Sequence, residues 1–501
     1  MTDLSFAFPE KKVLIIGSGI GGLSAGIILA KLGFDVTIIE KNRRPGGMMR
    51  SYTRNGIACN VGVHYLGSLA KGQMLGRLFD FLGVLLQIPT KRMGASGVID
   101  RYYLDSNLFP HAMFDMPEGL GAYEQNLRHS FPREQKQITK IMGNLHNAAR
   151  KINSLKFLFA GQNDFEILEH ATPMGELMTQ WNCSPGLRAV LGVPAAWIGV
   201  PLSACPAYYH NMILASYLLS SWRLKCSGAQ MADVFSARFK SLGGRIITDD
   251  AVAKIFVTDR IVKGVRLNSG RELKAPILIG AVHPKIILGM LPENAAKPSY
   301  RKRILRLEET HGICGAHVAV NASSHPALDH NLFKIATQPD GNIADMIFYQ
   351  MRKSEQKEKN LLTILFDVPA EHWEKWTGTR TGCRGLEYQN TKTRIAEKRL
   401  KEAKAMFGPL TNYKILDVFT PLSIRDWVNS PDGTAYGVQR SARQLLSAAL
   451  LNRTPIKGLF LAGQSVLAPG ILGAILGSLV TVKFIIGPQW FKKAFSDLQT
   501  G

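Results

Sequence analysis

Apolar runs interrupted by glycine occur at both ends of the chain. Residues 13–16 are apolar without a break, as in a strand buried on both faces, and residues 23–32 carry small and apolar side chains at helical spacing. Residues 35–39 predict a second strand, which ends at an acidic residue. Near the other end, a buried strand is predicted over residues 458–463, and an apolar helix begins at Gly470. The pattern predicts two strand–turn–helix units about 440 residues apart.

The chain between these ends divides into one helical and two mixed stretches. Residues 74 to about 217 are predicted to be largely helical, with an apolar stripe over 74–82 and a long basic segment over 125–159 that is amphipathic in its second half. A helix, the short strands of a β-meander and another buried strand follow, over residues 231–242, 245–247, 251–257, 262–267, 272–275 and 277–280. The last stretch, residues 300–445, mixes strands with a charged helix, over residues 317–320, 361–366 and 391–407.

Composition indicates a globular protein with a strongly basic surface. Hydrophobic residues make up 46% of the 501 residues, and no apolar run reaches the roughly 18 residues that a membrane-spanning helix needs. The formal net charge is +23. No nucleic-acid-binding motif accompanies this charge, so the pattern favours contact with an anionic membrane surface over nucleic acid. A solvated basic surface is the simpler alternative.

The N-terminus and the cysteines predict a cytoplasmic location. The first twelve residues lack the basic-then-apolar order of a secretory signal. The six cysteines are scattered without C-x-x-C pairs, which predicts reduced thiols and neither a disulfide framework nor a metal site. We therefore expect a cytoplasmic protein, peripherally associated with a membrane; the sequence indicates no oligomeric state.

The first glycine-rich turn has the spacing of a dinucleotide-binding loop. Gly17, Gly19 and Gly22 fall in G-x-G-x-x-G order between the first strand and its helix. Gly17 permits the tight turn, Gly19 lets the backbone approach a pyrophosphate, and Gly22 lets the helix lie close to the strand. The helix N-terminus can face the phosphates, and Glu40 can accept hydrogen bonds from both hydroxyls of an adenosine ribose. A glycine turn without a ligand would not account for this acid.

Two later segments predict further contacts with an elongated ligand. Gly46 and Gly47 follow the ribose-binding acid, where backbone can lie against a cofactor and nearby arginines can pair with its phosphates. The alternative there is a plain Pro-Gly-Gly turn. The turn from Gly463 to Gly470 again places a helix N-terminus where a phosphate or a polarised ring atom can bind. Two such units suggest one long ligand held at both ends.

Four segments are candidates for chemistry, substrate contact or membrane contact. His64 and Tyr65 lie in a glycine-flanked loop, where they could donate a proton, line a ring-shaped ligand or serve structure alone. Residues 194–199 and 206–210 are rich in aromatics and proline, and could line an apolar channel or pack in the core. Residues 484–495 pair aromatics with lysines, as in a membrane interface or in a plain terminal helix.

Together these motifs resemble those of the FAD-dependent phytoene desaturase, carotenoid isomerase and retinol saturase group. The resemblance rests on segments spread over nearly the whole chain: residues 13–40, 46–49, 61–67, 420–422, 433–437 and 462–474. The sequence departs from the group's pattern at Asn60, where an aspartate is usual. It departs again at residues 227–229, Ser-Gly-Ala, where Gly-Gly-Ser or Gly-Gly-Ala is usual.

The resemblance implies an α/β fold with two interleaved domains. A Rossmann-like FAD-binding domain, of the glutathione reductase or amine oxidase type, would comprise residues 1–84, residues 221–298 with the meander, and residues 446–501. An α+β substrate domain would comprise residues 85–220, mostly helical, and residues 299–445.

The resemblance also implies where FAD binds. The adenosine would lie at Glu40, beside Lys41 and the backbone of Val252, with the isoalloxazine near residues 62–65 and 470–474. The predicted cofactor contacts are Gly17, Ser18, Gly19, Ile20, Gly22, Glu40, Lys41, Gly46, Gly47, Met48, Met49, Val61, Gly62, His64, Val252, Gly463, Gln464, Gly470, Ile471, Leu472 and Ala474.

The activity that the resemblance implies is hydride transfer between flavin N5 and a lipophilic polyene, isoprenoid or related unsaturated lipid, by a desaturase, saturase or redox-neutral isomerase. Tyr65 or His64 is the predicted proton source, with Tyr436 as a weaker choice. NADPH, a quinone and oxygen are all possible electron partners. Two alternatives use the same scaffold: an amine oxidase-like flavoenzyme with a polar or aromatic-caged pocket, and a non-catalytic prenyl-lipid-binding protein without flavin.

Overall fold

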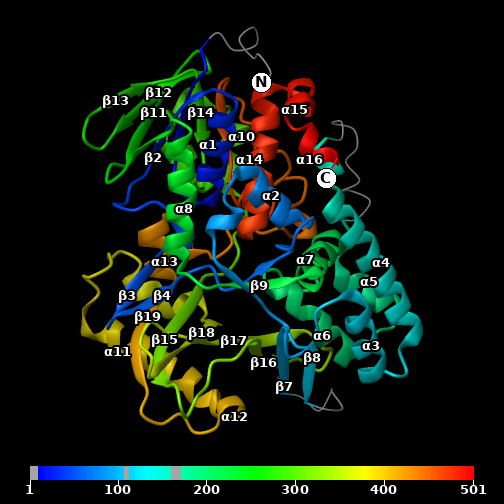
Figure 1. Cartoon of the computed structure of the whole chain (residues 1–501). Coiled ribbons are helices and arrows are strands. Elements are labelled where there is room, and N and C mark those ends of the chain that lie inside the picture. Colours follow the sequence, from blue (N-terminus) through cyan, green and yellow to red (C-terminus); the bar gives the residue numbers. More distant parts are fainter. Residues whose placement is uncertain (1–9, 106–111, 160–170, 501) are drawn as a thin grey trace.

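The computed structural model describes residues 10–105, 112–159 and 171–500, in which two β-sheets organise two halves of the molecule (Figure 1). A five-stranded parallel sheet lies in the upper half of Figure 1 and a seven-stranded sheet lies below it. Residues 1–9, which belong to the N-terminal segment predicted to lack a secretory signal, lie outside the described residues. None of the helices within the described ranges has both the length and the apolar composition needed to span a bilayer.

The five-stranded sheet joins the two ends of the chain. Its order is β10-β2-β1-β14-β20, and all four pairings are parallel. The strands are β1 (Lys12–Ile16), β2 (Asp35–Ile39), β10 (Arg245–Ile247), β14 (Ile277–Gly280) and β20 (Leu459–Leu461). All five lie in segments predicted to be strands, and β1, β14 and β20 carry the apolar runs expected of a parallel strand buried on both faces. They fall in the three ranges predicted for the FAD-binding domain.

Helices cover one face of this sheet and a β-meander covers the other. Side chains of β1 alternate between the two cores, with Val13 and Ile15 on the helical side and Leu14 and Ile16 on the meander side. The helices are α1 (Ile20–Lys31), α2 (Met74–Leu82), α8 (Gly228–Ser241) and α14 (Gly470–Ile486). The meander consists of β11 (Val252–Thr258), β12 (Ile261–Leu267) and β13 (Glu272–Lys274), and α9 (Pro284–Met290) and α10 (Pro298–Leu305) follow β14.

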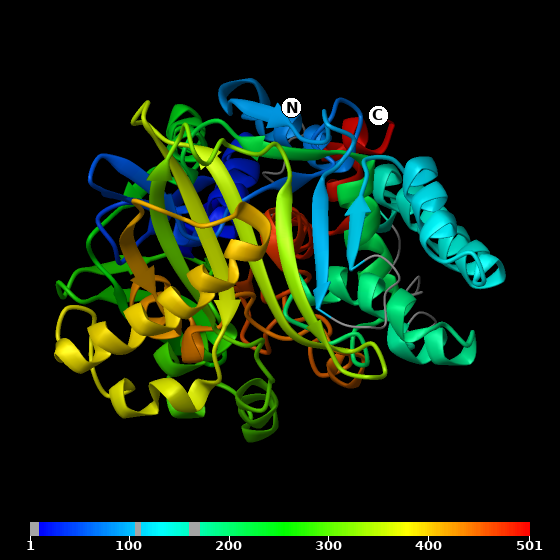
Figure 2. The same cartoon turned by 90° about the horizontal axis from the view of Figure 1, so that it is seen from below.

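The seven-stranded sheet has the order β19-β15-β18-β17-β16-β7-β8 and is antiparallel except between β16 and β7. Its strands are β7 (Asp100–Asp105), β8 (Met113–Met116), β15 (Ile313–Asn321), β16 (Asn331–Thr337), β17 (Ile343–Lys353), β18 (Lys359–Asp367) and β19 (Lys414–Phe419). α11 (Gly385–Glu402) and α12 (Lys404–Phe407) pack on its outer face, as Figure 2 shows. α13 (Pro421–Val428) follows β19.

A group of helices packs against the other face of this sheet, around Phe333, Ile335 and Phe348. These helices are α3 (Leu120–Ser130), α4 (Gln135–Ser154), α5 (Met174–Gln180), α6 (Pro185–Ala196) and α7 (Ala207–Leu219). Short strands join the two halves: β3 (Ser51–Arg54) with β4 (Ile57–Asn60), and β5 (Leu66–Gly67) and β6 (Thr90–Arg92) with β9 (Ser221–Leu224).

The helical prediction for the middle of the chain is wrong in part. The stretch from 74 to 217 is not helical throughout, because it contains β6, β7 and β8; β7 is a strand because it pairs with β16, more than 200 residues later. The basic segment over 125–159 is two helices, α3 and α4, separated at Phe131. Pro132 disfavours helical backbone at the residue before it, and Phe131 has φ −129°. The strands β16 and β17 were not predicted at all.

The aromatic tail packs inward. Phe491, on α15 (Pro488–Ala494), and Phe495, before α16 (Ser496–Thr500), are buried in the core shared with α2 and α14. Their rings contact each other, with centroids 4.5 Å apart. The tail is thus a terminal helical segment that completes the core, and its most apolar side chains are not available to a membrane.

Candidate cofactor cradle and cavity

The turn between β1 and α1 leaves room that the protein itself does not fill. Gly17 has φ +97°, and its N–H donates to the Ile39 carbonyl at 2.8 Å. A methyl group on Gly22 would overlap the Gly17 carbonyl oxygen, so these two glycines serve packing. A methyl on Gly19 would have a single neighbour within 4 Å among the described residues, the Cα of Gly47 at 4.0 Å. Gly19 therefore keeps open a space in front of the N-terminus of α1, as a dinucleotide pyrophosphate requires.

The Gly46-Gly47 turn forms the opposite wall of this space. The Gly46 N–H donates to the Ser18 carbonyl at 3.0 Å, and a methyl on Gly47 would come within 2.9 Å of the Cα of Gly19. Gly46 and Gly47 have φ +131° and +54°. A methyl on Gly62 would come within 2.9 Å of the Met48 carbonyl oxygen, so three chain segments meet backbone to backbone. We refer to the glycine-lined surface of Gly17, Gly19, Gly22, Gly47 and Gly463 as the cradle.

The C-terminal unit closes the cradle from the other side. A methyl on Gly21 would come within 2.5 Å of the Cα of Gly463, and the Ser478 hydroxyl donates to the Gly21 carbonyl at 2.8 Å. Gly463 has φ +98° and Gly470, which begins α14, has φ +78°. The two strand–turn–helix units predicted from the ends of the sequence are therefore in direct contact.

Glu40 is buried at the end of β2 and fully hydrogen bonded. Its Oε2 accepts from the Ser18 backbone N–H at 3.1 Å and from the Ser18 hydroxyl at 2.5 Å. Its Oε1 accepts from the Asn42 backbone N–H at 2.9 Å and from the Asn42 side-chain amide at 2.8 Å. These four donors use the four acceptor positions of a carboxylate, so a ribose hydroxyl can bind Glu40 only when the side chain of Ser18 or Asn42 rotates away.

Lys41 and Val252 flank Glu40 as the resemblance implies. The Lys41 ammonium donates to the Asp426 carbonyl at 2.7 Å, which ties this corner to α13. The Asp250 N–H donates to the Glu40 carbonyl at 3.3 Å, so the start of β11, with the buried Val252, lies beside it. The adenosine end of the predicted site is thus assembled from the β2–α13–β11 corner.

A cavity of about 2110 Å³ opens where the cradle ends. The seven-stranded sheet contributes Phe333, Phe348 and Leu365 to its wall, and α6 and α7 contribute mostly apolar and aromatic side chains. The lining also includes seven residues predicted for the site: Gly62, His64, Tyr65, Tyr436, Gly470, Ile471 and Leu472. Of the other predicted contacts, Gly463, Gln464 and Ala474 flank it, and those from residues 17–22, 40–41, 46–49, 61 and 252 lie outside its lining.

Burial sets the protonation of the polar groups in this wall. It lowers the pKa of His64 to about 4, so the imidazole is neutral at pH 7, and His64 Nε2 finds no hydrogen-bond partner within the described residues. Burial raises the pKa of Tyr65 well above its usual value, and it raises the pKa of Tyr436 as well. Both phenols are therefore protonated at pH 7 and can donate, whereas His64 holds no proton to give as an acid.

Tyr65 is held by aromatic packing and by a buried carboxyl. Its ring lies 4.7 Å from Tyr217 and 6.2 Å from Trp197, centroid to centroid. Its hydroxyl donates to Asp100 Oδ2 at 3.3 Å. Sequence reasoning missed Asp100, because its role depends on the pairing of β7 with β16 and no local motif surrounds it. Arg440, also missed, lines the cavity with its guanidinium donating to the carbonyls of Ala448 and Ser465.

The two departures from the group's pattern lie against each other. Asn60 Oδ1 accepts from the Gly228 N–H at 3.0 Å, at the start of α8. A methyl on Gly228 would overlap the Met49 carbonyl, so this contact joins β4, α8 and the turn of the cradle. The side-chain oxygen of Asn60 is thus an acceptor for the first backbone N–H of α8, a contact that an aspartate oxygen could also make.

Comparison with known proteins extends these findings. The model of the NAD(P)-binding Rossmann-like domain matches residues 15–82. All-trans-retinol 13,14-reductase of Rattus norvegicus is 24% identical over 98% of this chain and 88% of its own. A 4,4'-diapophytoene desaturase of a Methylomonas species is 23% identical over 79% of this chain and 80% of its own. The chain is a relative of the phytoene desaturase and retinol saturase group.

A solved structure agrees with this relationship at the level of the fold. Putrescine oxidase with bound putrescine has a TM-score of 0.65 and 16% identity, and the match covers 95% of this chain and 99% of the oxidase. This match confirms the predicted α/β architecture, with a Rossmann-like domain of the amine oxidase type, for this relative of the phytoene desaturases. Within the described residues, no cluster of three His, Cys, Asp or Glu side chains could hold a metal ion.

Proposed function

We propose that this protein is an FAD-dependent oxidoreductase that transfers hydride to or from a long, unsaturated lipid of the polyene or isoprenoid class. The observation that carries the proposal is a cavity of about 2110 Å³ with mostly apolar and aromatic walls, whose lining includes Gly62, next to the turn of the cradle, and Gly470 at the start of α14. Such a volume exceeds that of typical small-molecule pockets, roughly 300–1,000 Å³, and leaves room for a long ligand beside the ring system of a cofactor. The relatives named for retinol and diapophytoene reactions support the same class of substrate.

The cradle fits FAD in an extended conformation. Gly19 leaves space for the pyrophosphate, Glu40 would bind the ribose, and the segments around Gly62 and Gly470 would hold the ring system at the cavity. When bound, FAD accepts or supplies hydride at its N5 atom. NADPH, a quinone and oxygen are all compatible electron partners.

The residues of the chain itself bind and orient the lipid and supply its proton. Phe333, Phe348 and Trp197 offer an apolar surface that excludes water from the reacting carbons. A reaction that saturates or isomerises a double bond needs a proton source as well. Tyr65 is the best candidate, because it is protonated, faces the cavity and has a buried carboxyl behind it; Tyr436 is second, and the neutral His64 is weaker.

The charges in the cavity wall disfavour an amine substrate. Two carboxylates, Asp345 and Asp367, belong to the described lining. Asp345 pairs with Arg399 at 2.6 Å and Asp367 with His311 at 3.2 Å. Each carboxylate thus has a basic side chain beside it, which opposes the approach of an ammonium group. This arrangement favours a lipid over the amine oxidase alternative.

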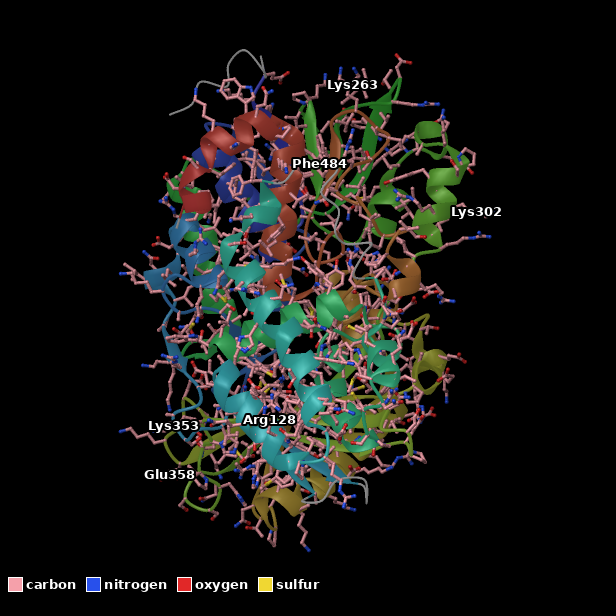
Figure 3. The ribbon with its side chains drawn as sticks, turned by 90° about the vertical axis from the view of Figure 1, so that its right-hand side faces the viewer. Arg128, Lys263, Lys302, Lys353, Glu358 and Phe484 are labelled. Carbon is pink, nitrogen blue, oxygen red and sulfur yellow. The ribbon has the colours of Figure 1, made fainter. Side chains whose placement is uncertain are left out.

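The mouth of the cavity suggests how a lipid enters. Three cavity-lining side chains are also exposed, Phe157, Leu446 and Leu450, with Leu446 71% exposed. Lys156, Arg453 and Lys457 line the same region. Other basic side chains lie elsewhere on the surface: Figure 3 shows Arg128, Lys263 and Lys302 well apart on α3, β12 and α10. We propose that the cavity mouth contacts an anionic membrane surface, with the exposed apolar side chains inserted among the headgroups.

The cofactor and the lipid are tested together on the purified protein. We expect flavin absorbance bands in the protein as isolated or after addition of FAD, and a copurifying unsaturated lipid in an organic extract. All-trans-retinol serves as a probe polyene, because a relative is named for its reduction. A protein that stays colourless with added FAD would support the non-catalytic lipid-binding alternative instead. A soluble polar amine in the extract would contradict the lipid assignment.

Membrane contact is tested with vesicles. Binding to vesicles that contain phosphatidylserine should exceed binding to pure phosphatidylcholine vesicles and should weaken as salt is added. Leu446→Ser should reduce binding, while the matched control Leu86→Ser, on an exposed leucine outside the cavity lining, should not. Equal loss in both variants would contradict a specific role for the mouth.

A further inference from the structure

A buried polar network lies directly behind Tyr65. Asp100 is fully buried at the start of β7, and its two oxygens have separate partners. Oδ2 accepts from the Tyr65 hydroxyl at 3.3 Å, and Oδ1 accepts from the Asn331 side-chain amide at 2.7 Å. Asp100 and Asn331 are direct neighbours in the pairing of β7 with β16. The sheet therefore places the carboxyl where it contacts the one cavity phenol that the reaction needs.

A second layer fixes the orientation of Asn331. Its Oδ1 accepts from Arg223 Nη2 at 2.7 Å and from Gln350 Nε2 at 3.0 Å. Because both acceptor positions of this amide oxygen are used, the NH₂ group must face Asp100. Gln350 also donates to the His64 carbonyl at 3.1 Å, which ties the loop of Tyr65 to the same network. Asn331 therefore donates to Asp100 whether or not the carboxyl is ionised. Among the described residues, only the contact of Asp100 with the Tyr65 hydroxyl can reverse its donor and acceptor.

The groups that face Asp100 leave it close to balance between its two protonation states. Burial raises the pKa of Asp100 to about 7, opposed by the hydrogen bonds from Asn331 and Tyr65 and by the charge of Arg223. The pKa of Arg223 is lowered by burial to about 10, so it is still charged at pH 7. Tyr102 and Tyr217 also face the carboxyl; burial raises the pKa of each, so both are neutral. Asp329 acts on the network from farther away, through Arg223.

We propose that Asp100 is a positioning residue that sets the direction of proton transfer at Tyr65. With Asp100 ionised, the Tyr65 O–H donates to it, and a lone pair of the phenol oxygen faces the cavity, ready to accept a proton. With Asp100 protonated, the carboxyl donates to the phenol oxygen, and the Tyr65 O–H is free to donate into the cavity. The inference rests on the proposed function, because it assumes that the reacting lipid lies against Tyr65.

The proton balance is closed within the network. In the direction that adds hydrogen, one carbon of a double bond receives hydride and its neighbour receives the Tyr65 proton: the phenol O–H bond breaks and a C–H bond forms. The Asp100 proton then moves to the phenol oxygen and leaves a carboxylate. In the direction that removes hydrogen, the same bonds form and break in reverse order, and Asp100 ends protonated. Each direction therefore needs the opposite starting state of Asp100.

The first test needs no substrate. Infrared spectra of the FAD-loaded protein should show a protonated carboxyl band that disappears as pH rises through about 7 and that is absent in Asp100→Asn. Tyr65→Phe removes a hydrogen bond to the carboxylate, so the midpoint should move upward by about one unit. Asp115→Asn, on the neighbouring strand β8, is the matched control and should leave the band unchanged. The proposal is overturned if the band is missing in the wild type or persists in Asp100→Asn.

The second test uses the pH profile of turnover. With all-trans-retinol and a chemical reductant, reduction should decline about tenfold per pH unit above 7 in the wild type. In Asp100→Asn, which keeps an acceptor for Tyr65 but cannot ionise, the profile should be flat across this range. An unchanged midpoint in that variant contradicts the proposal. Absence of turnover in every variant would count against the proposed function alone, because the infrared titration would still decide the role of Asp100.

Discussion

The cradle and the cavity are built on opposite principles. In the cradle, backbones from residues 17–22, 46–49 and 463 approach so closely that single methyl groups collide, and what defines the site is the absence of side chains. In the cavity, side chains from the seven-stranded sheet, α6, α7 and α14 line a large apolar space. A cofactor with fixed dimensions suits the first construction, and a flexible lipid suits the second. We therefore expect the two regions to fail differently when they are mutated.

The largest effect should be the loss of FAD on substitution of Gly19, the cradle glycine with the most open space around it. Gly19→Val places a side chain in the space in front of α1, where its Cβ has one neighbour at 4.0 Å. We expect complete loss of retained FAD, because the pyrophosphate loses its place, while thermal unfolding changes little. Flavin absorbance after gel filtration measures it. Wild-type flavin content in this variant would show that the cofactor is not bound where we place it.

The second effect is on the free energy of unfolding, and it distinguishes a glycine packed against backbone from a glycine with open space around it. Gly22→Ala puts a methyl on the Gly17 carbonyl and should lower the free energy of unfolding by about 3 kcal/mol. Gly143→Ala, in the middle of α4, meets no atoms within 4 Å and should raise it by about 0.5–1 kcal/mol. Denaturant unfolding measures both. A similar change in the two variants would contradict the close contact of α1 with the turn.

The third effect is a loss of stability at low pH, caused by two buried histidines, His64 in the cavity wall and His317. Burial lowers the pKa of His64 to about 4 and that of His317 to about 3, below the value of about 6.5 in the unfolded chain. The unfolded state therefore binds protons first, and stability present above pH 6.5 is lost as pH falls toward 4. Each histidine should cost about 2 kcal/mol between pH 7 and 5. His317→Gln should reduce the total loss by about 2 kcal/mol in denaturant titrations at the two pH values.

The smallest effect should come from partly filling the cavity. Ala196→Phe adds a ring to its wall, on the cavity-facing end of α6. We expect roughly a tenfold weaker binding of all-trans-retinol, about 1.4 kcal/mol, with FAD content unchanged. Fluorescence titration of the bound polyene measures it. Loss of flavin from this variant would mean that cavity and cradle are not the separate constructions described here.

The same contrast explains what could be predicted from the sequence. The cradle follows from local rules: glycine spacing, unbroken apolar strands and an acid at a strand end predict β1, α1, β2, β20 and α14. Even the contact of Gly21 with Gly463 follows from two matching units at the chain ends. The predicted ligand contacts there, such as Glu40 and Gly47, stay predictions until a flavin is seen.

The cavity could not be predicted in this way, because its walls form only when segments far apart in the sequence pair and pack together. β7 looks like an interruption in a helical stretch until β16 pairs with it, and Asp100 looks like a loop acid until Tyr65 is placed against it. Phe491 and Phe495 look like a membrane anchor until the core beneath them is assembled. Tertiary pairing decided each of these cases, and no local signal in the sequence carries it.

The contact of Gly21 with Gly463 has a consequence for biosynthesis. The ribosome makes the first wall of the cradle about 440 residues before the last, which at roughly 5–20 residues per second is a delay of about 20–90 s. Throughout that interval the nucleotide site lacks its last wall, and once β14 has been made its edge stays unpaired until β20 docks there. We therefore expect a complete site for the proposed flavin only after the segment around Gly463 has been made and has docked against α1.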